Sequence, residues 1–356
     1  MGLPNINIIF REQAIAAIQR GQRGVVALIL REEVPELMIE EMVSVAEIPE
    51  DISDYNKQQI RLAFMGYTVP PRKVIACIIP EDSLDYAEAQ HRLETIKWDY
   101  VAIPSISESE TMDFASWIKS LRDTKGIRVK AVLPDTPGDH EGIINVTIDN
   151  IVDNSGREFS TAEYCSRFAG LFAGTSLTIA STFAPLPEVV ECDNLIIEEL
   201  DDAIDNGEMT LYNDGEKIKV ARGVNSLVTT TEVKGELFQK IKIVDAMDMI
   251  FTDIKRTAED NYLGKYSNSY DNKCLLILAI QGYFETLEQE GILESGTSSV
   301  EIDIEANAAY LKSIGTDTNE MEAHEIKTAN TRDKVFLKAN ITILDAIEEI
   351  SLPINI

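Results

Sequence analysis

The sequence predicts two domains of different architecture, an α/β domain followed by an α+β domain. At 356 residues the chain is longer than a single hydrophobic core usually grows. Short apolar runs alternate with amphipathic helical patterns between residues 24 and 184, whereas a hairpin pattern and two long helical patterns occupy residues 209–291. Between them Pro185 and Pro187 interrupt the periodicity, so we place the domain crossing near residue 190.

The α/β prediction depends on strands that are nearly continuous apolar runs. Parallel strands that are buried on both faces have this composition, and the segments between them have the length of crossover helices. We therefore expect an open, largely parallel sheet with helices on both faces. The predicted strands are 25–30, 74–79, 100–103, 129–133 and 143–148, and the predicted helices are 54–65, 84–96, 111–122 and 161–173.

The second domain begins with a hairpin signal. Asn213-Asp214-Gly215 separates two strand patterns, and these residue types tolerate the positive φ of tight turns. A helix is expected to begin at Asp245, which can act as its N-cap, and a second helix to run from Ser269 to Gly291. Both helices should pack on the hairpin sheet. Further expected elements are an acidic helix at 195–206, a strand at 300–304, a helix at 306–314 and a long strand at 334–344.

The acidic composition restricts the classes of partner. The 61 acidic and 32 basic side chains give a net charge of -29, which disfavours binding to nucleic acid or to an anionic membrane surface. No apolar run approaches the roughly 18–20 residues of a membrane-spanning helix, and the first residues lack a signal-peptide pattern, so we expect synthesis in the cytoplasm. The four cysteines are widely spaced and are expected to be buried thiols rather than disulfides or zinc ligands.

The usual sequence signatures of catalysis and cofactor binding are missing. The segment from Gly170 to Ser176 is too short for a phosphate loop and has no lysine before Thr175, so we interpret Gly170 and Gly174 as a helix end. The three histidines belong to no zinc-binding spacing, and there is no Gly-x-Ser-x-Gly elbow. The sequence therefore predicts no catalytic residue, no metal ligand and no cofactor. A metal site in the acidic helix is the alternative, but a helix spreads its acids around its surface.

Both ends of the chain have the pattern of a strand. A terminal strand exposes unpaired backbone groups and an apolar row, which natural proteins normally protect. The ends could fold back on their own sheet, or they could extend and complete the sheet of a neighbouring subunit, which would produce a polymer held by main-chain hydrogen bonds. The alternating apolar residues are Ile6, Ile8 and Phe10 at one end and Ile350, Leu352, Ile354 and Ile356 at the other.

Taken in order, the motifs of the second half resemble the C-terminal domain of contractile tail sheath proteins, which form the outer cylinder of contractile phage tails and R-type bacteriocins. These motifs are Val220-Ala-Arg-Gly-Val-Asn-Ser-Leu-Val-Thr-Thr230, Asp248-x-x-x-x-Asp253-Ile254, Tyr262-Leu-Gly-Lys265 with Asn268, and Asp345-Ala-Ile-Glu-Glu-Ile350. In the last motif Ile347 stands where the family usually has Met. The opening Gly2-Leu-Pro-Asn-Ile-Asn-Ile8 is similar to that of the compact, diffocin-like type.

The resemblance implies a structural subunit and not an enzyme. Such subunits stack as hexameric rings around an inner tube and contract to drive the tube through a bacterial envelope. An outer α/β domain is inserted into an inner α+β domain that is built from both chain ends, and extended terminal β-arms exchange strands between subunits. The implied boundaries are 1–20 for the N-terminal arm and linker, 21–190 for the outer domain, 191–345 for the inner domain and 346–356 for the C-terminal arm.

The resemblance also implies partners and site residues. The partners are further copies of the chain, a tail tube protein, and baseplate and tail terminator proteins, first in the cytoplasm of the producing bacterium and then in a virion or a released particle. The alternatives are an α/β enzyme, a hydrolase or nucleotide binder with an oligomerising C-terminal domain, and a tail tube or baseplate adaptor. The implied inter-subunit arms are the alternating residues given above, and the implied arm-docking core consists of Arg222, Gly223, Val335, Leu337, Ile341 and Ile343. Arg222 is expected to pair with a carboxylate of its own or of a neighbouring subunit.

Overall fold

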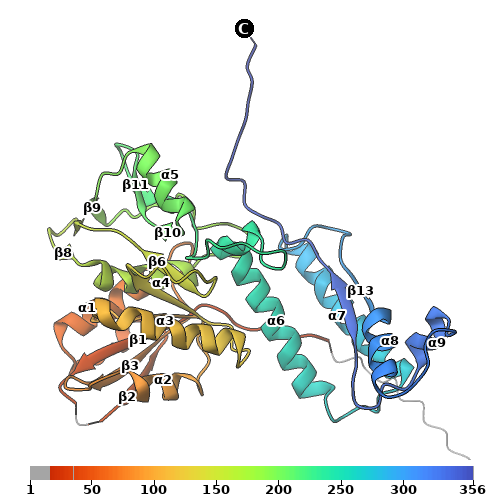
Figure 1. Cartoon of the computed structure of the whole chain (residues 1–356). Coiled ribbons are helices and arrows are strands. Elements are labelled where there is room, and N and C mark those ends of the chain that lie inside the picture. Colours follow the sequence, from red (N-terminus) through yellow and green to blue (C-terminus); the bar gives the residue numbers. More distant parts are fainter. Residues whose placement is uncertain (1–16, 35, 356) are drawn as a thin grey trace, which may run out of the picture. The chain divides into compact units, whose positions relative to one another are not determined.

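The computed structural model describes residues 17–34 and 36–355, and the chain divides into two compact units (Figure 1). The α/β unit comprises residues 21–251 together with the C-terminal residues from Leu344 onward. The second unit, which we call the helical unit, comprises residues 17–20 and Thr252–Ile343. Along the sequence, the chain therefore changes unit after Arg20, after Phe251 and after Ile343.

A seven-stranded sheet forms the centre of the α/β unit. Its strands are β1 (Val25–Glu32), β2 (Met38–Met42), β3 (Lys73–Pro80), β4 (Tyr100–Ala102), β5 (Lys130–Pro134), β6 (Ile143–Val146) and β10 (Glu208–Met209). They lie in the order β10-β6-β5-β4-β1-β3-β2, and all neighbours are parallel except β2, which runs antiparallel to β3. The prediction of an open, largely parallel sheet is confirmed. The sequence did not reveal β2, because this edge strand is half polar.

Helices cover both faces of this sheet (Figure 1). One face packs against α1 (Asp54–Phe64) and α4 (Thr161–Ala173), and the other against α2 (Ala87–Leu93) and α3 (Glu108–Asp123). Because side chains alternate along a strand, successive residues of β1 belong to the two different cores. This double burial explains why the central strands are apolar at almost every position.

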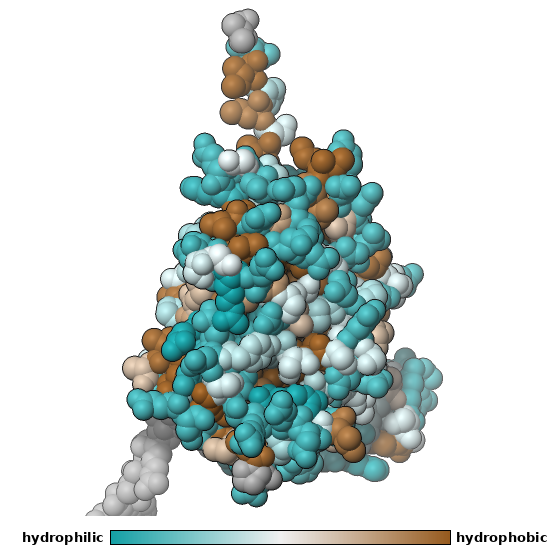
Figure 2. All heavy atoms as spheres, turned by 90° about the vertical axis from the view of Figure 1, so that its left-hand side faces the viewer, coloured by the Kyte–Doolittle hydropathy of each residue, from teal (hydrophilic) through white to brown (hydrophobic). Residues whose placement is uncertain are grey.

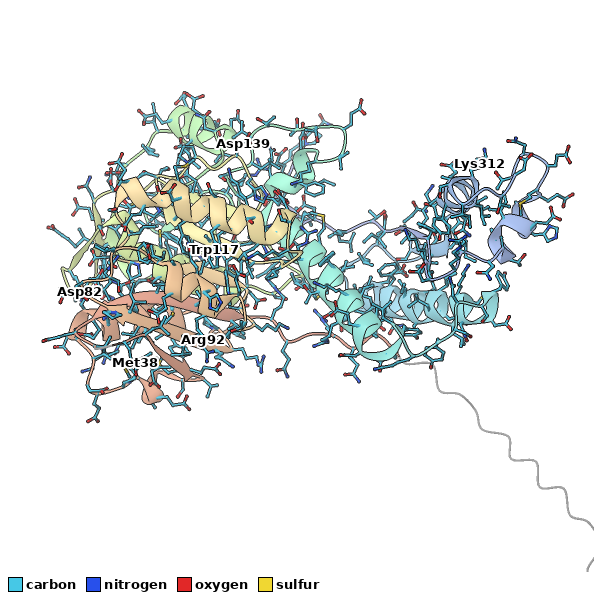
Figure 3. The ribbon with its side chains drawn as sticks, turned by 60° about the horizontal axis from the view of Figure 1, so that its bottom comes forward. Met38, Asp82, Arg92, Trp117, Asp139 and Lys312 are labelled. Atoms are coloured by element: carbon cyan, nitrogen blue, oxygen red, sulfur yellow. The ribbon has the colours of Figure 1, made fainter. Side chains whose placement is uncertain are left out.

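Both tryptophans belong to the core on the side of α2 and α3. Trp98 is buried and stacks on Trp117, with 6.1 Å between the ring centroids. Trp117 lies on α3 (Figure 3). Trp98 donates its indole N–H to the carbonyl oxygen of Leu93 at 2.9 Å, and Trp117 donates to Glu94 at 3.1 Å. The two rings therefore join α2 to α3.

The α/β unit extends well beyond residue 190. It also holds a three-stranded sheet of β8 (Glu158–Phe159), β7 (Ile151–Asp153) and β9 (Val189–Glu191), the helix α5 (Ile197–Asp205), and the antiparallel hairpin of β11 (Leu211–Asn213) and β12 (Ile218–Val220). The hairpin and the acidic helix occur where the sequence predicts them.

The division between the compact units does not coincide with the domain crossing expected near residue 190. Leu211 and Val220 of the hairpin share a core with the central sheet. The proline-containing segment is tied to the hairpin, since Phe183 and Leu186 donate backbone N–H groups to the carbonyl oxygens of Val220 and Ile218, each at 2.9 Å. The two prolines thus mark an irregular connection inside one unit rather than a linker between units.

The helical unit contains the end of α6 (Ile241–Asn261), α7 (Tyr270–Gln289), β13 (Ser299–Ile302), α8 (Ile304–Ser313), α9 (Ala323–Thr328) and β14 (Leu337–Asn340). Ser269 caps α7 as expected and accepts the Asn272 N–H at 3.3 Å. Among the helices of the described residues, none is long and apolar enough to cross a bilayer.

Two expectations for this part of the chain are wrong. Helix α7 packs against β13, whereas the hairpin on which it was expected to lie belongs to the other unit. The long strand expected at 334–344 is confined to β14, because Lys334 closes a turn by donating its N–H to the carbonyl oxygen of Thr331 at 3.1 Å. Past β14, Ile343 forms only an isolated bridge with Leu293.

Gly170 lies inside α4, so its interpretation as a helix end is wrong, whereas Gly174 does form the C-cap. A Cβ atom at Gly170 would collide with the backbone carbonyl of Ala63 on α1. The glycine is therefore required for the close approach of two helices on one face of the sheet.

We expect Gly170→Ala to lower the free energy of unfolding by about 1–3 kcal/mol, because α1 and α4 must separate to admit the methyl group. Urea unfolding followed by circular dichroism measures this change. Gly282→Ala is the matched control, since Gly282 lies in α7 with no atom within 4 Å of an added Cβ. Alanine should stabilise that helix by up to about 1 kcal/mol. Equal effects of the two substitutions would contradict the steric explanation.

Candidate assembly site

The first turns of α6 carry buried carboxylates that bind the α/β unit. Asp245 forms an ion pair with Arg23, accepts the hydroxyl of Tyr100 at 2.6 Å and lies 2.9 Å from Nζ of Lys130. Helix α6 begins one turn before this residue, at Ile241. The prediction that Asp245 is the N-cap is therefore wrong, because its carboxylate is directed to side chains of the sheet.

Asp248 lies further along the same helix and is also surrounded by cations. It accepts two hydrogen bonds from the guanidinium of Arg122, at 2.8 and 2.9 Å, and one from Lys130 at 2.5 Å. Burial opposes ionisation of Asp248, but the charges of Lys130 and Arg122 outweigh it and lower its pKa from 3.8 to about 2. Burial is likewise outweighed at Asp245, where Arg23 and Lys130 lower the pKa. The two carboxylates stay ionised and hold α6 to the sheet.

The C-terminal residues meet the α/β unit beside the start of α6. Nζ of Lys242 donates to the carbonyl oxygen of Leu344, and Lys240 forms an ion pair with Asp345. Glu348 is the centre of these contacts. It accepts the hydroxyl of Thr182 at 2.6 Å, Nη2 of Arg222 at 2.9 Å and Nζ of Lys240 at 3.3 Å. We call the four donor residues, Thr182, Arg222, Lys240 and Lys242, the clasp.

The structure shows which carboxylate pairs with Arg222. Its carboxylate partner is Glu348 of its own chain, which is one of the two possibilities that the sequence left open. Burial opposes ionisation of Glu348, but the hydrogen bonds from Thr182 and Arg222 and the charge of Lys240 lower its pKa. The sequence alone could not assign these contacts, although the Asp345-Ala-Ile-Glu-Glu-Ile350 motif contains all three carboxylates that pair with clasp residues, Asp345, Glu348 and Glu349.

Beyond the clasp, the C-terminal arm is open to solvent. Ile350, Leu352 and Ile354 are 85%, 74% and 75% exposed, and residues 350–355 form no strand. Figure 2 shows a protruding segment with hydrophobic residues on its surface. The described part of the arm therefore does not fold back onto a sheet of its own chain, which was one of the alternatives. The remaining arm residues of the prediction, Ile6, Ile8, Phe10 and Ile356, lie outside the described residues.

The residues expected to form the arm-docking core are divided between the two units. Arg222 and Gly223 lie in the α/β unit at the clasp, where the Gly223 N–H donates to the Thr182 hydroxyl at 3.1 Å. The other four belong to the helical unit on or around β14: Val335, Leu337, Ile341 and Ile343.

The pair of strands in the helical unit has unoccupied edges. β13 and β14 pair antiparallel from Ser299 opposite Asn340 to Ile302 opposite Leu337. In the described part of the chain, neither strand has a second strand partner. A two-stranded sheet of this kind has backbone donors and acceptors available on both outer edges.

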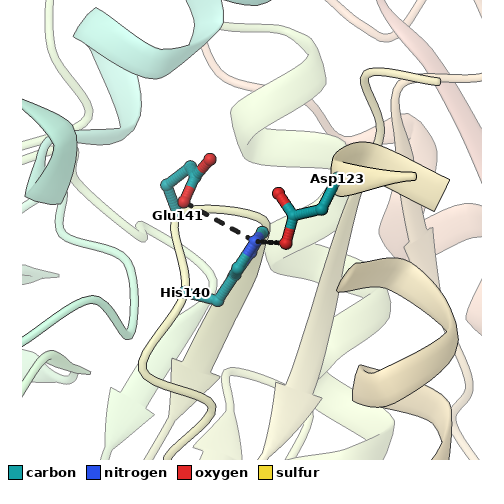
Figure 4. A group of neighbouring side chains, drawn as sticks. All are labelled: Asp123, His140 and Glu141. Carbon is teal, nitrogen blue, oxygen red and sulfur yellow. Dashed lines mark hydrogen bonds and ion pairs between the residues drawn. The ribbon is translucent and has the colours of Figure 1, made fainter. Parts of the chain in front are cut away.

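Asp123, His140 and Glu141 form a cluster of potential metal ligands (Figure 4). Nε2 of His140 lies 3.2 Å from Asp123 and 3.7 Å from Glu141. Nδ1 of His140 accepts the Gly142 N–H at 2.9 Å, so the neutral ring carries its proton on Nε2, the atom that faces the carboxylates. Lys234 lies 2.9 Å from Glu141 and neutralises it. This donor set fits an ion-pair network better than a metal centre.

Comparison with protein families shows matches along most of the chain. Residues 81–226 match the phage tail sheath protein central domain, and residues 233–356 match the phage tail sheath C-terminal domain. The tail sheath protein of Clostridium phage phiCD119 is 38% identical over 359 residues, which cover 99% of each chain. The phage-like element PBSX protein XkdK of Bacillus subtilis is 29% identical over 238 residues, 63% of this chain and 50% of the relative.

Solved structures share the fold at lower sequence identity. The sheath tail protein of Desulfitobacterium hafniense superposes with a TM-score of 0.71 at 17% identity, over 84% of this chain and 94% of the other. The sheath complex of an extracellular contractile injection system in its contracted state superposes with a TM-score of 0.70 at 12% identity, over 100% of this chain and 98% of the other.

Removing the charge of Asp248 should destabilise the α/β unit strongly. Asp248→Asn removes a counter-charge that buried Arg122 and Lys130 share, while Asp245 still pairs with Lys130, so we expect a loss of about 3 kcal/mol in the free energy of unfolding. Urea unfolding measures the loss. The control is Asp205→Asn, since Asp205 is exposed on α5, and its effect should stay within about 0.5 kcal/mol. A small effect at both positions would show that the buried network does not hold α6.

Acid should weaken the same network. Because the folded-state pKa of Asp248 is about 2 and its ordinary value is 3.8, its contribution is complete above about pH 4 and is lost as the pH falls towards about 2. We expect this residue alone to cost about 2 kcal/mol over that range. Urea unfolding at several acidic pH values measures the slope, which should be smaller for Asp248→Asn. Identical slopes for the parent and the variant would contradict the assignment.

Proposed function

The chain belongs to the phage tail sheath family, and from this premise we propose that it polymerises as stacked hexameric rings around an inner tube and contracts to drive the tube through a bacterial envelope. The members of this family found here are structural sheath proteins, which confirms the prediction that the chain is not an enzyme. The fold shared with a contracted sheath complex supports the contractile role.

The observation that carries the proposal is the exposed apolar row of the C-terminal arm. Ile350, Leu352 and Ile354 face solvent on alternate positions, although burying each such side chain is worth roughly 1.5–3 kcal/mol. A row of this kind is expected to be covered by a partner. We infer that the arm adds a strand to the sheet of a neighbouring subunit.

The proposed acceptor is the two-stranded sheet of β13 and β14. Its outer edges have no strand partner among the described residues, and strand addition satisfies such an edge with main-chain hydrogen bonds. Of the residues predicted for docking, Leu337 lies on β14, and Val335 is exposed just before this strand. The N-terminal arm with Ile6, Ile8 and Phe10 is proposed to serve a neighbour in the same way.

We further propose that the helical unit is the inner domain and the α/β unit is the outer domain. The support is the order of the chain, since residues 21–251 of the α/β unit interrupt the sequence of the helical unit. On this basis the proposed outer domain extends to Phe251 instead of residue 190.

Contraction requires stored free energy in the assembly. We propose that the extended sheath is a metastable packing and that contraction buries more surface between outer domains. Each additional 100 Å² of buried apolar area is worth roughly 2.5 kcal/mol per subunit. The net charge of -29 opposes close approach of subunits, and salt screens this repulsion beyond about 8 Å at physiological ionic strength.

The partners proposed for the chain follow from the sheath role. They are further copies of the chain, a tail tube protein, and baseplate and tail terminator proteins, with no binding to nucleic acid or membrane by the subunit itself. We propose that the subunit is made in the bacterial cytoplasm and is then carried in a virion or in a released phage-tail-like particle.

Introducing charge into the C-terminal arm should abolish assembly. Leu352→Asp with Ile354→Asp places two carboxylates in the proposed inter-subunit sheet, where burial without a partner costs several kcal/mol each. We expect electron microscopy of the purified variant to show no cylinders, and the same for deletion of residues 350–356. Leu84→Asp is the control, since Leu84 is an apolar residue that is 97% exposed outside the arms. Normal cylinders from the arm variant would contradict strand addition.

A further inference from the structure

We propose that the clasp is a peptide-binding site for the acidic segment 345–349 of the same chain, and that this site determines where the C-terminal arm leaves the subunit. The inference deepens the proposed function, because it rests on the arm as an assembly strand for its consequence. The occupancy of the clasp itself follows from contacts within the α/β unit.

Three distant segments of the chain build the clasp. Thr182 follows α4, Arg222 follows β12 and Lys240 precedes α6, yet all three donate to the single carboxylate of Glu348. The Thr182 hydroxyl is oriented by a second contact, because it accepts the Gly223 N–H at 3.1 Å. A site assembled from three segments in this way is a product of the fold and not of a local sequence contact.

The segments that carry the clasp residues are held to the α/β unit by other contacts. Lys240 and Lys242 stand at the start of α6, and the carboxylates of Asp245 and Asp248 bind that helix to buried cations of the α/β unit. Next to Arg222 the backbone approaches Ser181 closely, since a Cβ atom at residue 223 would collide with the Ser181 hydroxyl. The backbone that carries the donors is therefore held by contacts other than those with the acidic segment.

The acidic segment is held by polar side-chain contacts. Ile347 is exposed, and in the part of the chain that the structure describes no backbone–backbone hydrogen bond joins residues 345–349 to other residues. The two adjacent glutamates differ strongly, since the side chain of Glu348 is 10% exposed and that of Glu349 is 85% exposed. Glu348 is thus the residue on which the position of the segment depends.

The clasp limits the reach of the arm. Only Glu349 separates Glu348 from Ile350, and an extended chain advances by about 3.3 Å per residue. At that rise, residues 349–356 span about 26 Å when extended, so they can reach a sheet edge up to about this distance from Glu348. The spacing between linked subunits follows from this anchored length rather than from the whole C-terminal segment.

A spin label tests whether the acidic segment occupies the clasp. Ile347→Cys carries the nitroxide, Cys274→Ser removes the one native cysteine that is not buried, and Leu352→Asp with Ile354→Asp keeps subunits apart. We expect the electron paramagnetic resonance spectrum of this parent chain to be that of a nitroxide with restrained motion. Glu348→Gln and Arg222→Gln should each raise the ratio of mobile to restrained signal about tenfold, as for the loss of one charged hydrogen bond.

Three controls make the test specific. Glu349→Gln should change the spectrum far less than Glu348→Gln, because its carboxylate is 85% exposed and makes only a long contact with Arg222, at 3.5 Å. Exchange of the charges in Arg222→Glu with Glu348→Arg should restore part of the restraint, which a general loss of stability would not do. Unchanged thermal unfolding by circular dichroism verifies that each variant is folded. A spectrum that is equally restrained in Glu348→Gln and in the parent overturns the proposal.

The spin-label test of the clasp and the electron-microscopy test of strand addition can give different results. If the label becomes more mobile in the Glu348 and Arg222 variants while the arm variant still forms cylinders, the result supports binding of the acidic segment to the clasp and contradicts strand addition by the arm. If lowering the total protein concentration converts the restrained signal to a mobile one, the segment binds the clasp of another subunit, and the proposed binding within one chain is overturned.

Discussion

The buried carboxylates of α6 are the constraint on which the rest of the arrangement depends. Ionised groups inside a protein are tolerated only when opposite charges and hydrogen bonds surround them. Asp245 and Asp248 meet this condition with donors from the segment before β1, from β4, from α3 and from β5. The first turns of α6 are thereby fixed in one position on the α/β unit, because any displacement would leave charges unpaired.

Segments near both ends of the described chain contact the beginning of this helix. Arg23, which lies a few residues after the beginning of the described chain, pairs with Asp245, and the C-terminal segment pairs with Lys240 and Lys242. Apolar burial on the two faces of the sheet supplies most of the stability, whereas these ion pairs fix the orientation of the segments that they join to α6. In the proposed assembly, the direction in which the arm leaves the subunit decides which neighbour the arm can reach.

The distribution of apolar residues complements this polar framework. The central strands are apolar on both faces and are covered, whereas the C-terminal arm is apolar on alternate positions and remains uncovered in the single chain. Such an arm is a hazard unless assembly covers it. The large negative charge of the chain opposes indiscriminate association, which would favour the proposed strand addition over general aggregation.

The sequence alone determined the features that depend on local periodicity and on motif order. Apolar runs such as 74–79 predicted the parallel sheet, Asn213-Asp214-Gly215 predicted the hairpin, and the order of the C-terminal motifs predicted the family. Only the tertiary structure decided that Gly170 marks a helix contact, that Asp245 is a buried ion-pair partner, and that Glu348 binds Arg222. The reason is physical: periodicity encodes which face of an element is buried, but the partner of a charged side chain lies in a distant segment that only the fold brings near.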